Sequence, residues 1–186
     1  MFQIRVAQAA DVEDILSILI EVAPRVPIDL STPERVEAVR AQIKEYSRPG
    51  GCSFVAIDAK GMVVAFQLAE KIQWLDGPPY IHLVYAGTTC SASCQGAFRQ
   101  LIEAEKALGM SLVARVKSGN KSGMNDRLMR YGFRPTPRDA PAPSPCPIST
   151  ASSHTAGTRS KTGVREKLAE GVGHMNEVSA WDPLTK

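Results

Sequence analysis

The sequence predicts an α/β (α+β) domain in which helices cover both faces of a mixed, mostly antiparallel sheet. Up to Phe133, segments with apolar residues at every second position, as in strands, alternate with segments in which apolar residues recur every three to four positions, as in helices. Their order is strand, helix, helix, three strands, helix, strand, helix, which is typical of a three-layer domain. From Arg134 the composition changes abruptly. We therefore expect a domain over 1–133 and a mostly disordered tail over 134–186.

The first strand and two helices are predicted by alternation, caps and prolines. Residues 2–7 alternate as a strand, and Asp11 is in position to cap the helix that follows. For the second helix, Ser31 with Glu34 three residues later matches a capping box, and Pro33 falls in the first turn, where its missing N–H does no harm.

The middle of the sequence is predicted to form an antiparallel meander. Residues 53–58 and 62–74 read as a hairpin that turns at Ala59-Lys-Gly61. A second turn over 76–79 leads into a strand over 80–86, so that this strand pairs back against its predecessor.

The stretch from 80 to 133 carries most of the functional information. A loop of small residues over 87–93 follows the strand, and a helix with an apolar stripe runs from Cys94 to Leu108. A helix that begins directly after a strand offers unpaired N–H groups and a positive dipole end, where phosphate binds without charged side chains. The same small residues also join strands to helices that bind nothing, so both interpretations stay open.

The last predicted strand spans 111–116, and Ser122 can cap a short helix that ends before Gly132-Phe133. Beyond it, six of the chain's 13 prolines lie within residues 135–147, and Ser, Thr, Ala and Gly dominate the residues that follow. Such a composition does not build a packed core. A weak helix over 163–181 and a partner-binding role for the tail are the alternatives.

Composition excludes several classes of protein. A net charge of +3 gives no concentrated basic field, so nucleic acid is not an expected partner. The four cysteines form no CxxC pair, and no metal site is expected. No signal peptide and no run of 18 apolar residues is present, so we expect a cytoplasmic protein that does not contact a membrane.

Three motifs together resemble the GNAT superfamily of N-acetyltransferases. Residues 4–15 (IRVAQAADVEDI) resemble the family's opening strand and helix, and residues 54–66 resemble its central hairpin. Asn120, followed by Leu128 and then Gly132-Phe133, resembles its closing segment. The resemblance covers residues 3–135 and implies a GNAT-like fold that uses acetyl-CoA as co-substrate.

The resemblance also implies where acetyl-CoA would bind. The cofactor arm would run along Leu83, Val84 and Tyr85, and Asn120 would contact it. The pyrophosphate would rest on a loop that includes the main-chain amides of Ser93, Cys94, Gln95, Gly96 and Ala97. Of the usual loop motif only Gly96 is present, Ser93 replaces a Gln or Arg, and Phe98 stands where a very small residue is common. The Phe98 ring either obstructs the phosphates or turns into the core.

Acetyl transfer needs a base for the amine and a proton source for the leaving thiolate. Glu70 and His82, on the two central strands, are the candidate bases. By alternation, Val84 shares a face with His82, while Leu83 and Tyr85 take the other. The family often has a Tyr at the position of Leu128, so Tyr131 is the candidate acid, and a packed aromatic is its alternative.

We therefore predict an acetyl-CoA-dependent N-acyltransferase that transfers acetyl to an amine by direct attack. The alternative is a catalytically weak or inactive GNAT-fold module that binds or acts as a scaffold, which the departures at Ser93, Phe98 and Leu128 favour. The resemblance implies that residues 24–29 help shape the acceptor site, and it leaves open a small amine or a peptide as acceptor, as well as a homodimer.

Overall fold

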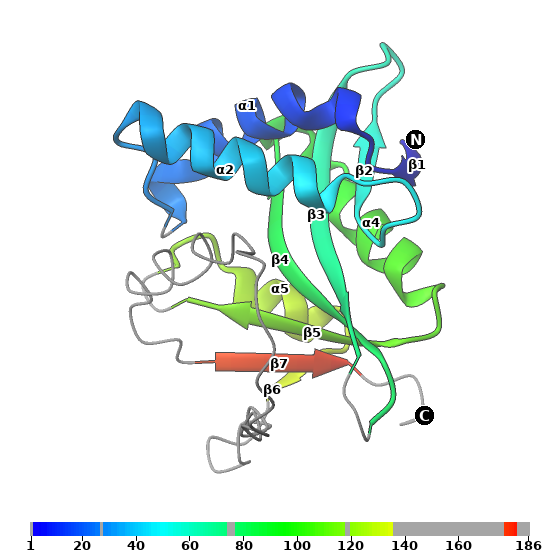
Figure 1. Cartoon of the computed structure of the whole chain (residues 1–186). Helices are drawn as coiled ribbons and strands as arrows, with labels where there is room; N and C mark the ends of the chain where they lie inside the picture. The colour runs from blue at the N-terminus through cyan, green and yellow to red at the C-terminus, as the bar shows by residue number, and fades with distance from the viewer. Residues whose placement is uncertain (1, 27, 74–76, 118–119, 136–176, 182–186) are drawn as a thin grey trace, which may run out of the picture.

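The computed structural model describes residues 2–26, 28–73, 77–117, 120–135 and 177–181. Within these ranges the chain forms one twisted sheet with helices on both faces (Figure 1). The strand order is β1-β2-β3-β4-β5-β7-β6, with β1 Gln3–Val6, β2 Phe54–Ile57, β3 Val63–Ile72, β4 Tyr80–Thr88, β5 Ser111–Val116, β6 Arg134–Pro135 and β7 Glu177–Trp181. Every neighbouring pair is antiparallel except β4 and β5, which are parallel. The predicted mixed, mostly antiparallel sheet is confirmed.

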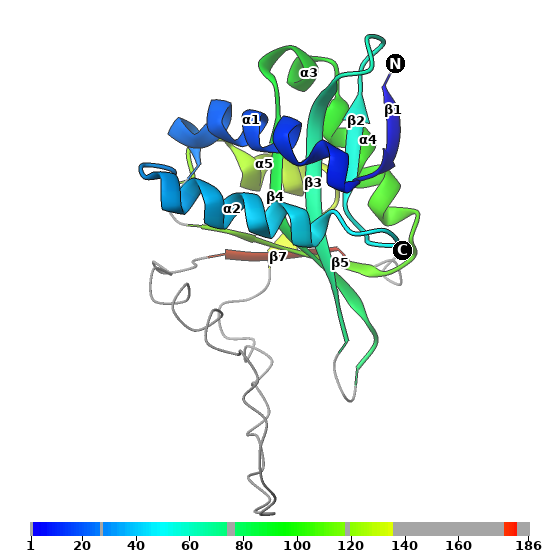
Figure 2. The ribbon, with the colours of Figure 1, turned by 45° about the horizontal axis from the view of Figure 1, so that its top comes forward.

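The helices divide between the two faces of the sheet, as Figure 2 shows. They are η1 Ala9–Asp11, α1 Val12–Val22, η2 Ala23–Arg25, α2 Pro33–Tyr46, α3 Cys90–Cys94, α4 Ala97–Lys106 and α5 Met124–Arg130. One face packs against α1 and α2, whose apolar stripes join Phe66 and Leu68 of β3 in a core. The other face packs against α4 and α5, whose Ile102 and Leu128 meet Leu112 of β5.

Two helix starts differ from the predicted caps. The buried Asp11 carboxylate binds Arg5 and accepts the N–H of Gln8, so it stabilises the turn before α1 and makes no side-chain cap. The cap of α2 is Thr32, not Ser31, because the Thr32 hydroxyl accepts the N–H of Arg35 and Pro33 is the first helical residue. The predicted N-cap, Ser31, was therefore one residue too early.

The predicted helix over 94–108 is two helices. Gly96 has a φ of 78°, in the left-handed region that favours glycine, and it separates α3 from α4. The helix that faces the core therefore begins at Ala97, and the first four residues of α3 fall in the segment predicted as a loop.

The sheet continues beyond Phe133, where the predicted domain ends. β7 lies between β5 and β6 and pairs antiparallel with both, so residues 177–181 form a strand and no helix. Pairing with β5 satisfies backbone groups that would otherwise stand exposed at its edge. The rest of the predicted tail, residues 136–176 and 182–186, lies outside the described residues.

Candidate active site

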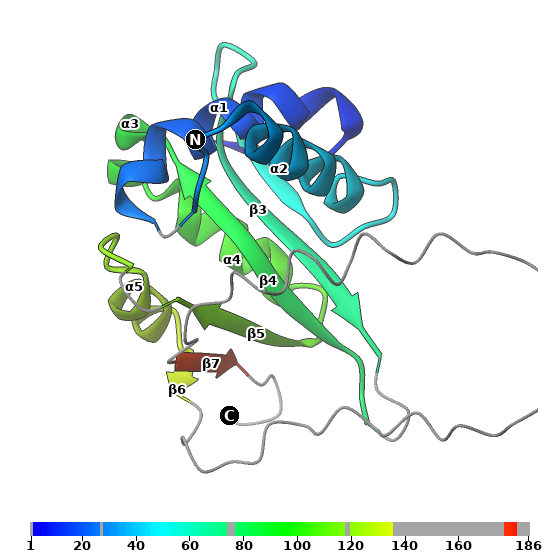
Figure 3. The ribbon, with the colours of Figure 1, turned by 60° about the vertical axis from the view of Figure 1, so that its left-hand side comes forward.

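A wedge opens between β4 and β5, the only parallel neighbours in the described sheet. They pair over Tyr80–Leu83 and Ser111–Ala114, and the register ends there although β4 continues to Thr88 and β5 to Val116. Figure 3 shows the two strands diverging from this point. Along this edge of β4, the N–H and C=O groups beyond Leu83 have no ladder partner on β5, and such an edge can bind an extended chain that carries amides.

A β-bulge in β4 lies at the apex of the wedge. Ala69 of β3 is opposite Leu83 and Leu68 is opposite Tyr85, so Val84 is the extra residue. A bulge breaks the simple alternation of side chains along a strand. Leu83 therefore packs with α4 and α5, whereas Tyr85 packs with α1 and α2. The prediction that Leu83 and Tyr85 share one face was wrong for this reason.

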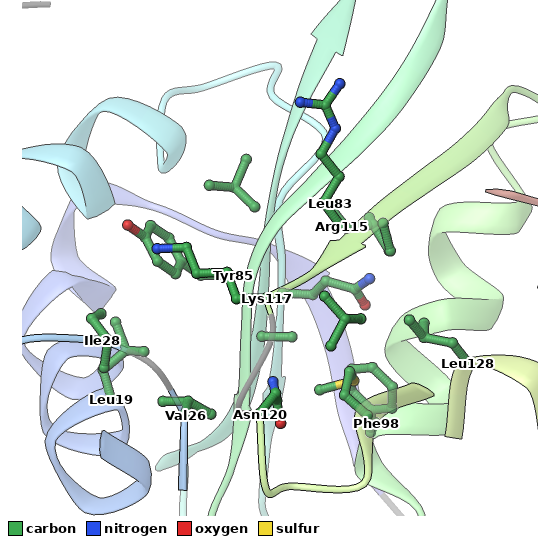
Figure 4. Close-up of a pocket in the computed structure, with 16 residues that line it drawn as sticks. Leu19, Val26, Ile28, Leu83, Tyr85, Phe98, Arg115, Lys117, Asn120 and Leu128 are labelled. Carbon is green, nitrogen blue, oxygen red and sulfur yellow. The ribbon is translucent and has the colours of Figure 1, made fainter. Parts of the chain in front are cut away.

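The wedge holds an apolar inner compartment (Figure 4). Together with its open mouth it encloses about 840 Å³ of empty space. Leu19, Val26 and Ile28 line it on the side of α1, and Phe98 and Leu128 line it on the side of α4 and α5. The charged side chains among its lining residues are Arg115 and Lys117, at the end of β5 and just after it.

An outer compartment adjoins the inner one near the C-terminal end of β4. The two share four lining residues, Val26, Ala86, Phe98 and Met124. The outer compartment is lined by the cationic side chains of Arg25, Lys121 and Arg127 and by no carboxylate. Among the described residues none of the three forms an ion pair, although Arg25 lies 3.5 Å from the Cys90 sulfur. The cleft thus combines an apolar interior with a cationic mouth.

Phe98 lies in the first turn of α4 and is 5% exposed. Its ring packs in the core that contains Ile102 and Leu128, and its centroid is 5.8 Å from that of Tyr131. Of the two orientations left open by the sequence, the structure has the ring turned into the core, where it forms a wall of both compartments.

The predicted pyrophosphate loop lies next to this wall. The main chain of Ser93 and Cys94 ends α3, Gln95 is exposed, and Ala97 is fully buried at the start of α4. Gly96 is the N-cap of α4 and no side chain caps it. The first N–H groups of a helix have no intrahelical acceptor, so this helix start offers hydrogen-bond donors close to the outer compartment.

Four predicted cofactor-binding residues line the inner compartment together: Leu83, Val84, Tyr85 and Asn120. The Asn120 carbonyl oxygen accepts the N–H of Ser122 at 2.8 Å, which fixes the side chain at the floor of the wedge. The Tyr85 hydroxyl donates to the Gln42 side chain at 2.9 Å, and burial raises the pKa of Tyr85.

Glu70 and His82, the two candidate bases, lie opposite each other on β3 and β4. His82 Nδ1 is 3.0 Å from Glu70 Oε1, and the side chains are 19% and 40% exposed respectively. Glu70 follows Ala69, which packs with α4 and α5, so the pair lies on the opposite face, with α1 and α2. The structure thus brings the two candidates together one residue before the start of the wedge, although neither is among the residues that line the two compartments.

Tyr131, the candidate acid, ends α5 and packs on Phe98. It is absent from the residues that line either compartment. This position matches the alternative of a packed aromatic.

A second buried polar pair lies behind the cleft. Glu105 of α4 and Gln67 of β3 are fully buried, and neither their carboxylate oxygens nor their amide atoms have a hydrogen-bond partner among the described residues. Burial raises the pKa of Glu105 to about 9. The nearby Gln67 amide acts to lower this pKa, but no hydrogen bond of ordinary geometry joins the two side chains. Gln67 also lines the inner compartment. Glu105 is therefore a neutral acid near pH 7.

Within the described ranges, no three His, Cys, Asp or Glu side chains come together as a metal site requires. No helix in the same ranges has the length and apolarity needed to span a membrane.

The sequence did not single out the cationic residues of the cleft, although Arg25 belongs to the segment 24–29 that was expected to shape the acceptor site. Arg25, Lys121 and Arg127 come from two segments about 100 residues apart, and no local pattern joins them. Arg115 and Lys117 had a signal, because they alternate with the buried Ala114 and Val116 at the end of a predicted strand. That alternation places both on the face of α1 and α2, which is also the face of Glu70 and His82.

No protein-family model and no curated protein matches this sequence. Solved structures do match its fold. A Drosophila melanogaster polyamine N-acetyltransferase is 15% identical with a TM-score of 0.59, and 74% of this chain and 85% of that chain are covered. The PaiA N-acetyltransferase of Thermoplasma acidophilum, in complex with coenzyme A, is 13% identical with a TM-score of 0.55, over 75% and 94%. The GNAT-family protein YhbS of Escherichia coli, also in complex with CoA, is 17% identical with a TM-score of 0.50, over 72% and 68%.

Identities this low establish the fold and no more. The parallel pair that splays, the bulge at its apex and the helices on both faces agree with that likeness. The described part of this chain has the fold of the GNAT-family N-acetyltransferases.

Proposed function

We propose that this protein is an N-acyltransferase that moves an acetyl group from acetyl-CoA to an amine by direct attack. The observation that carries the proposal is the wedge between β4 and β5, where pairing stops at Leu83 and Ala114. Neighbours with this fold include structures in complex with coenzyme A.

The residues of the cleft fit acetyl-CoA. The exposed edge of β4 beyond Leu83 can pair with the two amides of the pantetheine arm, and the apolar inner compartment suits the arm's methylene groups. The cations Arg25, Lys121 and Arg127 lie where the arm would leave the wedge, and they suit its phosphates. In this chain, side-chain charge thus makes up for the loop motif that retains only Gly96.

In the proposed reaction, the amine nitrogen forms a bond to the acetyl carbonyl carbon and the carbon–sulfur bond breaks. The amine loses a proton and the thiolate gains one, so the products are an amide and a thiol. A main-chain N–H at the bulge of Val84 would polarise the carbonyl. We assign the role of base to the Glu70–His82 pair and leave Tyr131 out of the mechanism, because it packs on Phe98.

Titration calorimetry with acetyl-CoA tests the proposal on the full chain. We expect binding, and we expect Arg127→Glu to weaken it at least about tenfold, because a repulsive charge then faces the phosphates. Arg130→Glu is the matched control. It changes the same charge in the same last turn of α5, but Arg130 does not line the cleft, so affinity should stay within about twofold.

Absence of heat at millimolar acetyl-CoA would remove the proposal. Binding without turnover of any amine would instead favour the alternative of a GNAT-fold module that binds acetyl-CoA without catalysis.

A further inference from the structure

The inner end of the cleft is positively charged, and this charge affects which amines can act as acceptor. This inference rests on the proposed function. If the phosphates occupy the outer compartment, the acetyl group lies at the apex near Val84, between the two faces of the sheet. The α4 and α5 face of the apex is closed by Phe98, Leu128 and Val116, all nearly fully buried. The acceptor therefore approaches from the face of α1 and α2.

Two cations stand on that face of the apex. Arg115 and Lys117 line the inner compartment, and both are exposed. In Figure 4 the Lys117 side chain runs toward Tyr85, and the Arg115 side chain points away from Phe98. Neither forms an ion pair with any residue in the described part of the chain.

Among the side chains that the structure describes, no carboxylate balances these cations at the cleft. The lining residues of both compartments include no Asp or Glu. Of the nearby carboxylates, Asp29 pairs with Arg35 and caps the N–H of Ser31, and Glu70 contacts His82. The approach to the apex is thus positive, and a second positive charge on an acceptor would be repelled there.

We propose that the acceptor is an amine that also carries an anionic group, a carboxylate or a phosphonate, which Arg115 and Lys117 hold while the amine meets the Glu70–His82 pair. This class differs from the cationic polyamine named for one structural neighbour. Arg115 and Lys117 are then specificity-determining residues, because they contact the acceptor away from the reacting nitrogen.

Initial rates of thiol release from acetyl-CoA test the class. The probes are amines of similar size: glycine and β-alanine with a carboxylate, 2-aminoethylphosphonate with a phosphonate, ethanolamine with no second charged group, and the diamine ethylenediamine. We expect kcat/KM for the anionic amines to exceed that for ethylenediamine by at least about tenfold, with ethanolamine between them. The larger of the carboxylate and phosphonate rates identifies the anion.

Variants of the two cations assign the effect. Lys117→Glu and Arg115→Glu should each reverse the preference toward ethylenediamine, because each replaces a cation that attracts the acceptor's anionic group with a carboxylate that repels it. Arg99→Glu, an exposed site on α4 outside the cleft, is the matched control and should leave the order of amines unchanged.

The inference and the proposed function fail in different ways. A preference for ethylenediamine in the unchanged chain, an order that Lys117→Glu leaves unaltered, or acetyl-CoA binding without turnover of any of the five amines would overturn the inference. Absence of acetyl-CoA binding in calorimetry would overturn the proposed function itself, and the inference with it.

Discussion

The contact between His82 and Glu70 is the residue-level feature on which the proposed chemistry depends. A carboxylate 3.0 Å from a histidine nitrogen orients the ring, as a base at an acceptor site requires. We predict that His82→Gln lowers kcat by about a hundredfold. Calorimetry should give an unchanged acetyl-CoA affinity. Lys71→Gln, at an exposed site on the neighbouring strand β3, is the control, and equal losses in both variants would contradict the assignment.

Phe98 shows how one side chain carries both packing and function. Because its ring is buried against Ile102 and Leu128, we predict that Phe98→Ala lowers the free energy of unfolding by about 3–5 kcal/mol. Phe98→Leu, which keeps most of the apolar volume, should cost about half of that or less. Urea unfolding measures both. Unchanged stability with tighter acetyl-CoA binding in Phe98→Ala would show that the ring obstructs the cleft.

At the level of elements, the sequence predicted much of the order of strands and helices, but it did not predict features that depend on the register between neighbouring strands. Alternation located the strands at 80 and 111, in which buried residues alternate with less buried ones, and the hairpin was located by its turn and by its apolar second strand, which is buried on both faces. The bulge at Val84 has no local signature, since an extra residue leaves the composition of a strand unchanged. The break at Gly96 was also missed, because the apolar stripe continues across it.

The residues of the candidate site also divide into those with a local sequence signal, which were predicted, and those without one. Leu83, Val84, Tyr85 and Asn120 were predicted for the cofactor cleft and line it together, since they follow from strand and loop positions. The cations of the outer compartment come from η2, from the loop before α5 and from the last turn of α5, which meet only through the tertiary fold. Phe98 was ambiguous in the sequence because its helix position is compatible with a core or a cleft residue, and in the structure it lines both.

At the level of the whole molecule, the strand order ties the cleft to the end of the described chain. β7 pairs with β5, so residues 177–181 support the outer side of the strand that carries Arg115 and ends before Lys117. A parallel pair with one strand held by β3 and the other by β7 can stay apart at one end, because each strand keeps a ladder on its far side. The wedge is therefore a property of the full sheet.

The buried Glu105 should make the stability of the whole domain depend on pH. Its folded-state pKa of about 9 lies above its ordinary value of 4.5, because burial disfavours the charged carboxylate. The folded protein thus retains a proton that the unfolded chain releases above about pH 4.5. The contribution of Glu105 to the free energy of unfolding is therefore most favourable below about pH 4.5. It decreases by up to about 1.4 kcal/mol per pH unit as the pH rises toward 9, and it is constant above about pH 9.

Glu105→Gln isolates this effect, because it keeps the volume and a neutral polar group while removing the titration. Between about pH 6 and about pH 8, we predict that the free energy of unfolding of Glu105→Gln rises relative to the unchanged chain by about 2–3 kcal/mol, measured by urea unfolding at several pH values. Glu103→Gln, on the exposed side of the same helix, is the control and should stay within about 0.5 kcal/mol of the unchanged chain at each pH. Parallel pH curves for Glu105→Gln and the unchanged chain would show that this carboxyl is ionised in the fold, and the core between α4 and β3 would then have to be wetter than its burial indicates.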